Sequence, residues 1–117
     1  MQAELKALRT ITHEELPIEM EGNFGIWVRA MIGPKGEDSS ESFDFLVCTP
    51  EWFAANELKD IRIGRHVLFM KNYNPQNLHQ FVEDFCLRCI GETWQIIAEK
   101  LGRLGQWEFE DYQSHLK

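Results

Sequence analysis

Cys86 and Cys89 form a C-x-x-C motif, a spacing used by thiol redox enzymes and by zinc sites. In redox enzymes the motif begins a helix, where the helix dipole lowers a thiol pKa, whereas here it closes a predicted helix. A four-ligand zinc site would need Cys48 and a distant His66 or His79, because no second C-x-x-C is present. The favoured interpretation is packing, with Cys89 in the core and Cys86 at its border. We expect neither a metal nor a cofactor.

The histidines stand in no motif that binds a metal or activates a nucleophile; they are His13, His66, His79 and His115. Two carboxylates could act together in glycoside hydrolysis, and sequence cannot exclude such a pair because the requirement is spatial. The acidic residues nevertheless lie among polar neighbours, which argues against the raised carboxyl pKa that a general acid needs. Gly33 and Gly36 lack the spacing of a phosphate-binding loop. We therefore predict no enzyme, with a small carboxylate-using hydrolase as the alternative.

Acidic residues give the chain its strongest chemical character. It has 19 Asp and Glu against 12 Lys and Arg, a formal net charge of −7, which disfavours direct binding to nucleic acid because phosphate contacts need a basic surface. Residues 37–57 hold six acidic residues and no Lys or Arg, and a second acidic group lies near the C-terminus. Such charge either solubilises a surface or attracts a basic protein partner. The residues that we predict to contact such a partner are Glu37, Asp38, Glu41, Asp44, Glu108, Glu110 and Asp111.

Two strands and the loop between them must position the first of these acids. Apolar residues alternate over 24–32 and again over 41–48, which predicts a strand pair with one fully apolar face. The polar stretch Gly33–Glu41 cannot be buried and is too long for a tight turn, so we expect a protruding hairpin loop. Trp27 shares the less apolar face of the first strand with Arg29. A covering helix is the favoured interpretation for Trp27, and a sticky binding surface is the alternative.

Cap residues and apolar spacing predict three helices. Thr49 before Pro50 and Asn74 before Pro75 each place a side-chain acceptor ahead of a proline at the first helical position. The helices are expected at 50–57, 75–90 and 93–104, and further strands at 2–11, 66–70 and 107–112, the last with a helical turn as its alternative. The apolar stripe of the second helix is Leu78, Phe81, Val82, Phe85 and Cys89.

These elements predict one α+β domain over residues 1–117. We expect a mainly antiparallel sheet of about four to five strands, with three helices packed mostly on one face. The odd number of cysteines, three, favours reduced thiols and the cytoplasm. The N-terminal residues lack the basic and apolar regions of a secretory signal, and no apolar run is long enough to span a membrane. We expect a cytoplasmic protein that is a monomer or a weak homodimer.

Two blocks of the sequence together form a specific motif pattern, although each block by itself is a weak signal. The first is Gly33–Glu37, Glu41–Phe45 and Cys48–Trp52; the second is Gly91–Trp94, Ala98–Leu101 and Trp107–Tyr112. Together these blocks resemble the immunity protein 8 family of bacteria, in the family's order and with similar spacing, and they span most of residues 24–112. Residues 1–22 and 54–65 carry little of the resemblance.

The resemblance implies a function. Such immunity proteins bind the C-terminal toxin domain of a cognate polymorphic or contact-dependent growth inhibition toxin, often a nuclease, and neutralise it in the cytoplasm. A generic protein-interaction adaptor domain is the other alternative to this reading. Reversing the charges of Glu37, Asp38 and Glu41 together is expected to weaken toxin binding and its salt dependence. The motif aromatics are interpreted as core residues that maintain the fold: Phe43, Phe45, Trp94, Trp107 and Phe109.

Overall fold

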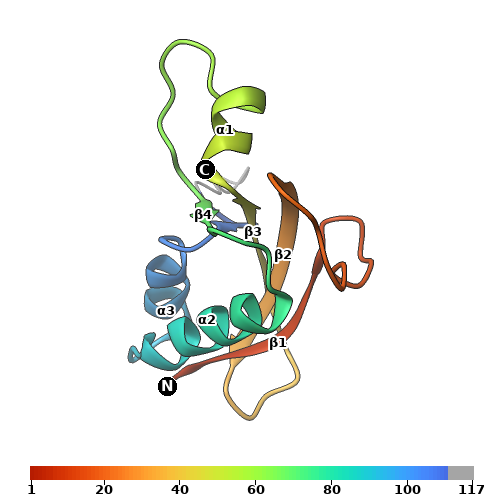
Figure 1. The fold of residues 1–117 in the computed structure, drawn as a ribbon. Helices are drawn as coiled ribbons and strands as arrows, with labels where there is room; N and C mark the ends of the chain where they lie inside the picture. The colour runs from red at the N-terminus through yellow and green to blue at the C-terminus, as the bar shows by residue number, and fades with distance from the viewer. Residues whose placement is uncertain (111–117) are drawn as a thin grey trace.

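Residues 1–110, which the computed structural model describes, form five strands and three helices (Figure 1). In chain order these are β1 (Ala3–Thr10), β2 (Gly25–Pro34), β3 (Glu41–Cys48), α1 (Pro50–Asn56), β4 (Val67–Phe69), α2 (Pro75–Arg88), α3 (Trp94–Leu101) and β5 (Gln106–Trp107). The expected α+β class, with a mostly antiparallel sheet, is confirmed.

The strands form one sheet in the order β1-β2-β3-β4, and β5 also pairs with β3. The β1–β2 and β2–β3 pairs are antiparallel, and the second of them is the hairpin that alternation predicts over 24–32 and 41–48. β4 runs parallel to β3 beside Leu46–Cys48, whereas β5 runs antiparallel beside Phe43–Asp44. Because β2 occupies the other edge of β3, the two short strands share one edge, end to end.

The main core lies between one face of the sheet and the helices α2 and α3. Its buried members include Phe24, Val28, Ala30, Ile32, Phe43, Phe45 and Val47 from β2, β3 and the residue before β2, and Leu78, Val82, Cys86, Ile97, Ala98 and Leu101 from the helices. These sheet residues occupy alternate positions, so the period-two pattern of the sequence marks the buried face correctly.

Helix α1 packs on the opposite face. Phe53 joins Leu46 and Cys48 in a second, smaller core, and the ring of Trp52 covers Gly25, where a Cβ would lie 2.3 Å from a ring carbon. The helices therefore lie mostly on one face, as expected, with α1 as the exception. Larger side chains at position 25 would displace Trp52 and with it the start of α1.

The caps of α1 and α2 match the sequence, but the predicted helix lengths and one buried stripe are partly wrong. The Thr49 hydroxyl accepts from the Trp52 amide at 3.4 Å, and the Asn74 side chain accepts from the Asn77 amide at 3.0 Å. Helix α2 ends at Arg88 rather than 90, and α3 covers 94–101 rather than 93–104. In α2 the buried positions are Leu78, Val82 and Cys86, so Cys86 is a core residue rather than a border residue, and Phe81 is 45% exposed.

The C-terminal strand is also shorter than expected. Only Gln106–Trp107 pair with β3, and residues 108–110 form a turn, while 111 and 112 lie outside the described residues. Phe109, expected in the core, is 39% exposed and packs edge-on against Trp107, with ring centroids 5.7 Å apart. Its exposure follows from the turn, which ends the alternation of strand side chains.

Candidate functional site

The hairpin loop between β2 and β3 carries two exposed acids of the predicted contact set, Glu37 and Asp38. The Lys6 ammonium donates to the backbone carbonyl of Glu37 at 2.6 Å and to the carboxylate of Glu4 at 2.5 Å. Glu4 also accepts from the Gly36 amide, and the hydrogen bond from Lys6 is the main cause that holds the pKa of Glu4 below its usual value. Because Lys6 is paired with Glu4, the loop itself keeps Lys35 against Glu37 and Asp38, a formal charge of −1 over residues 35–40.

Glu41 occupies a structural position rather than an open one. Its Oε1 atom accepts hydrogen bonds from the indole nitrogens of Trp94, at 2.7 Å, and Trp107, at 2.8 Å. Trp94 begins α3, Trp107 lies on β5 and Glu41 begins β3, so one carboxylate oxygen joins three elements far apart in the sequence. Glu41 belongs to the first block of the family resemblance, and Trp94 and Trp107 belong to the second, so the two blocks are in contact through this carboxylate.

Asp44 and Glu108 are also engaged within the chain. On the open sheet face, Asp44 lies opposite Arg29 and pairs with it through two hydrogen bonds of 2.8 and 2.9 Å, which raise the pKa of the guanidinium. The Glu108 carboxylate accepts from the backbone amide of Ser42 at 2.7 Å and so extends the contact between β3 and the segment after β5. Asp44 thus supports the pairing of β3 with β2, and Glu108 supports the contact of β3 with the turn that follows β5.

Glu110 lines a cleft of about 660 Å³ between the start of β4 and the end of α3. Its carboxylate forms an ion pair with Arg65 and lies 3.9 Å from His66 Nε2. The Nε2–H of His66 donates to the carbonyl of Gly102 at 2.7 Å, at the C-terminal end of α3. These contacts attach the α1–β4 connection to the C-terminal turn. Asp111, the seventh predicted residue, lies outside the described residues.

The predicted contact set therefore separates into two groups. Glu37 and Asp38 are exposed in the hairpin loop, while Glu41, Asp44, Glu108 and Glu110 each bind a donor of the same chain. The four residues of the second group lie on or near β3 and β5. Their carboxylates hold parts of the fold together, which accounts for the acidic residues at these positions. This geometry does not test contact with a partner, so the set stays a prediction.

A second exposed acidic segment is the β1–β2 loop, which we define as residues 11–24. It holds Glu14, Glu15, Glu19 and Glu21, all exposed, and residues 10–28 contain no Lys or Arg. Sequence reasoning missed this loop because it weighed only the charge of residues 37–57 and of the C-terminal acidic group. The same count of acidic and basic residues, applied to 10–28, would have found it.

The covering helix expected over Trp27 is wrong. α1, the helix that packs on this face within residues 1–110, covers Leu46 and Cys48 and leaves Trp27 40% exposed. Ile11 pairs with Trp27 through a backbone hydrogen bond of 3.2 Å and is 39% exposed. The alternative reading of Trp27, as part of an exposed apolar surface, therefore describes its environment.

The three cysteines are free and buried. Desolvation raises the pKa of Cys86 to about 12 and that of Cys48 to about 11, and it also raises the pKa of Cys89. Within residues 1–110, no group of three or more His, Cys, Asp and Glu side chains is arranged to hold a metal ion. The C-x-x-C motif is thus buried in the core, with thiols that stay protonated.

We expect the native thiols to resist a thiol-specific disulfide reagent at pH 8, because thiolate is the reactive form and burial suppresses it. Unfolding in denaturant should make all three react. Since folding raises these pKa values above the ordinary 9.0, the folded chain holds the thiol protons more tightly. Their contribution to stability is complete below about pH 9 and declines as pH rises toward 12. Rapid labelling of one thiol in the native protein would contradict this assignment.

The model of the family described as Immunity protein 8 matches residues 3–112, from the start of β1 to beyond β5. No curated protein and no solved structure matches the chain. The described residues contain no helix long and apolar enough to cross a membrane.

Proposed function

Because the chain belongs to the immunity protein 8 family, we propose that it binds the C-terminal domain of a cognate polymorphic or contact-dependent growth inhibition toxin and neutralises it as a stoichiometric inhibitor. Family membership makes the chain an immunity protein that acts against a toxin. The match over residues 3–112 carries the proposal, because it includes all eight elements of the fold and not one motif alone.

The charge of the chain supports a nuclease as the toxin. A nuclease must bind phosphates and therefore presents a basic cleft, and a net charge of −7 complements such a surface. We propose that the inhibitor works without catalysis and in the cytoplasm, where nucleic acid is accessible to the toxin. The tight engagement of Glu41, Asp44 and Glu108 within the fold supports a non-catalytic role for these carboxylates.

Titration calorimetry against the toxin domain encoded beside this chain, with toxin activity followed in parallel, tests the proposal. We expect one-to-one binding and a loss of activity that is complete at one equivalent, because a stoichiometric inhibitor has no turnover. A toxin domain from an unrelated system serves as the control. Loss of toxin activity at far less than one equivalent would favour an enzyme, and no binding to a folded cognate domain would refute the proposed function.

A further inference from the structure

The β1–β2 loop has a net negative charge and contains no Lys or Arg. Glu15, Glu19 and Glu21 form no ion pair with the residues that the structure describes, and Glu14 accepts only from the Thr12 hydroxyl, at 2.9 Å, among side chains. The hairpin loop differs in its charge count: residues 35–40 hold Lys35 with Glu37 and Asp38, a formal charge of −1, whereas residues 11–24 hold four glutamates and no Lys or Arg, a formal charge of −4. Uncompensated charge acts over a Debye length of about 8–10 Å and accelerates encounter with an oppositely charged surface.

Exposed apolar side chains lie within and beside the same loop. Ile18, in the middle of the four glutamates, is 88% exposed, and Ile11 at the start of the loop pairs with the exposed Trp27. Protein interfaces place aromatic and aliphatic anchors among charged rim residues, and tryptophan is over-represented among the residues that dominate binding energy. The loop adjoins Trp27 through the backbone hydrogen bond of Ile11, so acidic and exposed apolar side chains occur at the same end of β2.

The loop is held in place although its acids are exposed. Leu16 and Met20 pack against the main core, and the Tyr73 hydroxyl donates to the Pro17 carbonyl at 2.7 Å. At the start of the loop, the Thr10 amide donates to the Glu14 carbonyl at 2.9 Å. A segment fixed in this way loses less conformational entropy on binding than a free loop would.

The two acidic loops cannot serve the same small interface. They extend from opposite ends of β2, and ten strand residues span about 33 Å. A standard interface buries about 800 Å² on each partner, which is roughly 30 Å across. Figure 1 shows the β1–β2 loop at one side of the molecule and the hairpin loop at another. The partner must therefore centre on one of them.

We infer that the toxin docks through a basic surface onto the β1–β2 loop and the adjoining Trp27, in place of the hairpin loop that the sequence pattern favoured. This surface, the acidic end, comprises Glu14, Glu15, Ile18, Glu19, Glu21 and Trp27. The glutamates steer and orient the basic partner, and Ile18 and Trp27 are the apolar anchors. The inference rests on the proposed function and names the contact surface for that same binding event.

The charge test compares two double reversals of equal charge change. Glu15→Lys with Glu19→Lys alters the acidic end, and Glu37→Lys with Asp38→Lys alters the hairpin loop; each raises the formal net charge from −7 to −3. We expect the first pair to slow toxin association by roughly 10- to 100-fold at low salt and to flatten its salt dependence. The second pair should change the rate by less than about threefold. Equal losses, or a larger loss from the hairpin pair, would overturn the inference.

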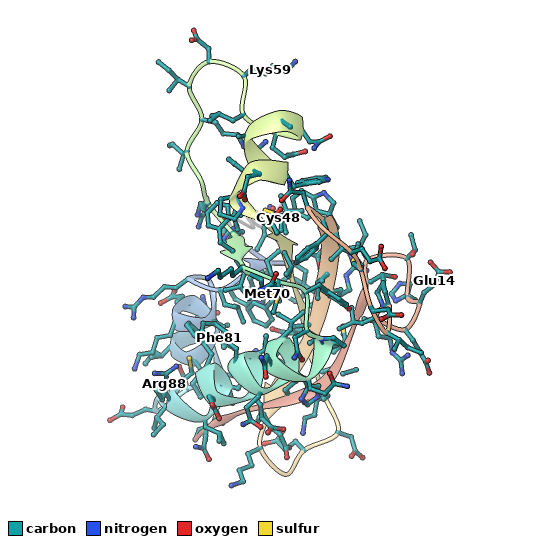
Figure 2. All side chains as sticks on the ribbon, viewed as in Figure 1. Glu14, Cys48, Lys59, Met70, Phe81 and Arg88 are labelled. Carbon is teal, nitrogen blue, oxygen red and sulfur yellow. The ribbon has the colours of Figure 1, made fainter. Side chains whose placement is uncertain are left out.

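The anchor test uses two isoleucines of similar exposure. Ile18→Ala removes the anchor of the acidic end, and Ile61→Ala removes a side chain that is 92% exposed on the α1–β4 connection. Figure 2 shows that connection, where Lys59 is labelled, well apart from Glu14 on the β1–β2 loop. We expect about a tenfold rise in the toxin Kd for Ile18→Ala and no change for Ile61→Ala, with both variants folded because both positions are exposed.

The outcomes separate this inference from the function on which it rests. If the unaltered chain binds the toxin but both acidic-end variants bind as tightly, the docking surface is wrong and the function stands. If the unaltered chain does not bind, the proposed function fails first. If Ile18→Ala changes self-association in sedimentation while toxin affinity is kept, the acidic end contacts a second copy, and the inference is again overturned.

Discussion

Phe43→Ala is expected to lower the free energy of unfolding by about 3–5 kcal/mol, as large aromatic deletions in a core do. Phe43 is fully buried, and its ring stacks on Trp107 with centroids 6.5 Å apart and planes 9° from parallel. Truncation leaves a cavity between β3 and β5, where Phe43 and Trp107 are paired residues. Denaturant unfolding followed by tryptophan fluorescence measures the change.

Phe109→Ala is the matched control for this variant. Phe109 contacts the same tryptophan, edge-on at 5.7 Å, but is 39% exposed and lies in a turn. We expect a loss of about 1 kcal/mol, because an exposed ring leaves no closed cavity. Toxin affinity of the folded fraction should be unchanged in both. Equal destabilisation by the two truncations would mean that Phe109 belongs to the core after all, as the sequence pattern indicated.

Local patterns explain the parts of the fold that sequence predicted well. Alternation set the β2–β3 pair and its buried face, because side-chain direction in a strand depends only on position. Thr49 and Asn74 marked helix starts because a cap binds an amide two or three residues away. Each of these features involves neighbours in the chain, so the information lies within a short window.

Features that depend on distant partners could not be predicted in the same way. β4 pairs with β3 in parallel, and β4 and β5 lie end to end along the same edge of β3. Both placements depend on the path that the chain takes through α1, α2 and α3 before it comes back to the sheet. The length of α2 and the exposure of Phe81 depend on which neighbours cover each face, since Leu78, Val82 and Cys86 already fill the space over the sheet. Helical spacing alone does not contain that choice.

Charge counting found acids but could not assign their roles. Glu41 and Asp44 lie inside a strand whose neighbours supply donors, whereas Glu15 and Glu19 lie in an irregular connection with no basic residue nearby in sequence. The sequence shows part of this difference between the two kinds of acid. An acid within an alternating strand has cross-strand partners, and an acid in a polar connection does not. Applying that rule to the whole chain would have directed attention to residues 11–24.

Glu41→Ala is expected to lower the free energy of unfolding by about 3 kcal/mol, because it leaves two partly buried indole N–H groups without their acceptor. Glu41→Gln should recover part of the loss, since its amide oxygen can accept from at least one indole. Glu37→Ala, an exposed glutamate four residues away, is the control and should change stability by less than about 0.5 kcal/mol. Thermal unfolding of the three variants, with toxin affinity measured below the transition, separates a structural role of Glu41 from contact with the toxin.

If Glu41→Ala keeps full stability but loses toxin binding, Glu41 is a contact residue and the two indole hydrogen bonds contribute little to the fold. If stability falls while the folded fraction binds normally, the carboxylate acts by joining β3, α3 and β5, and the motif shared with the family serves the scaffold that presents the binding surface.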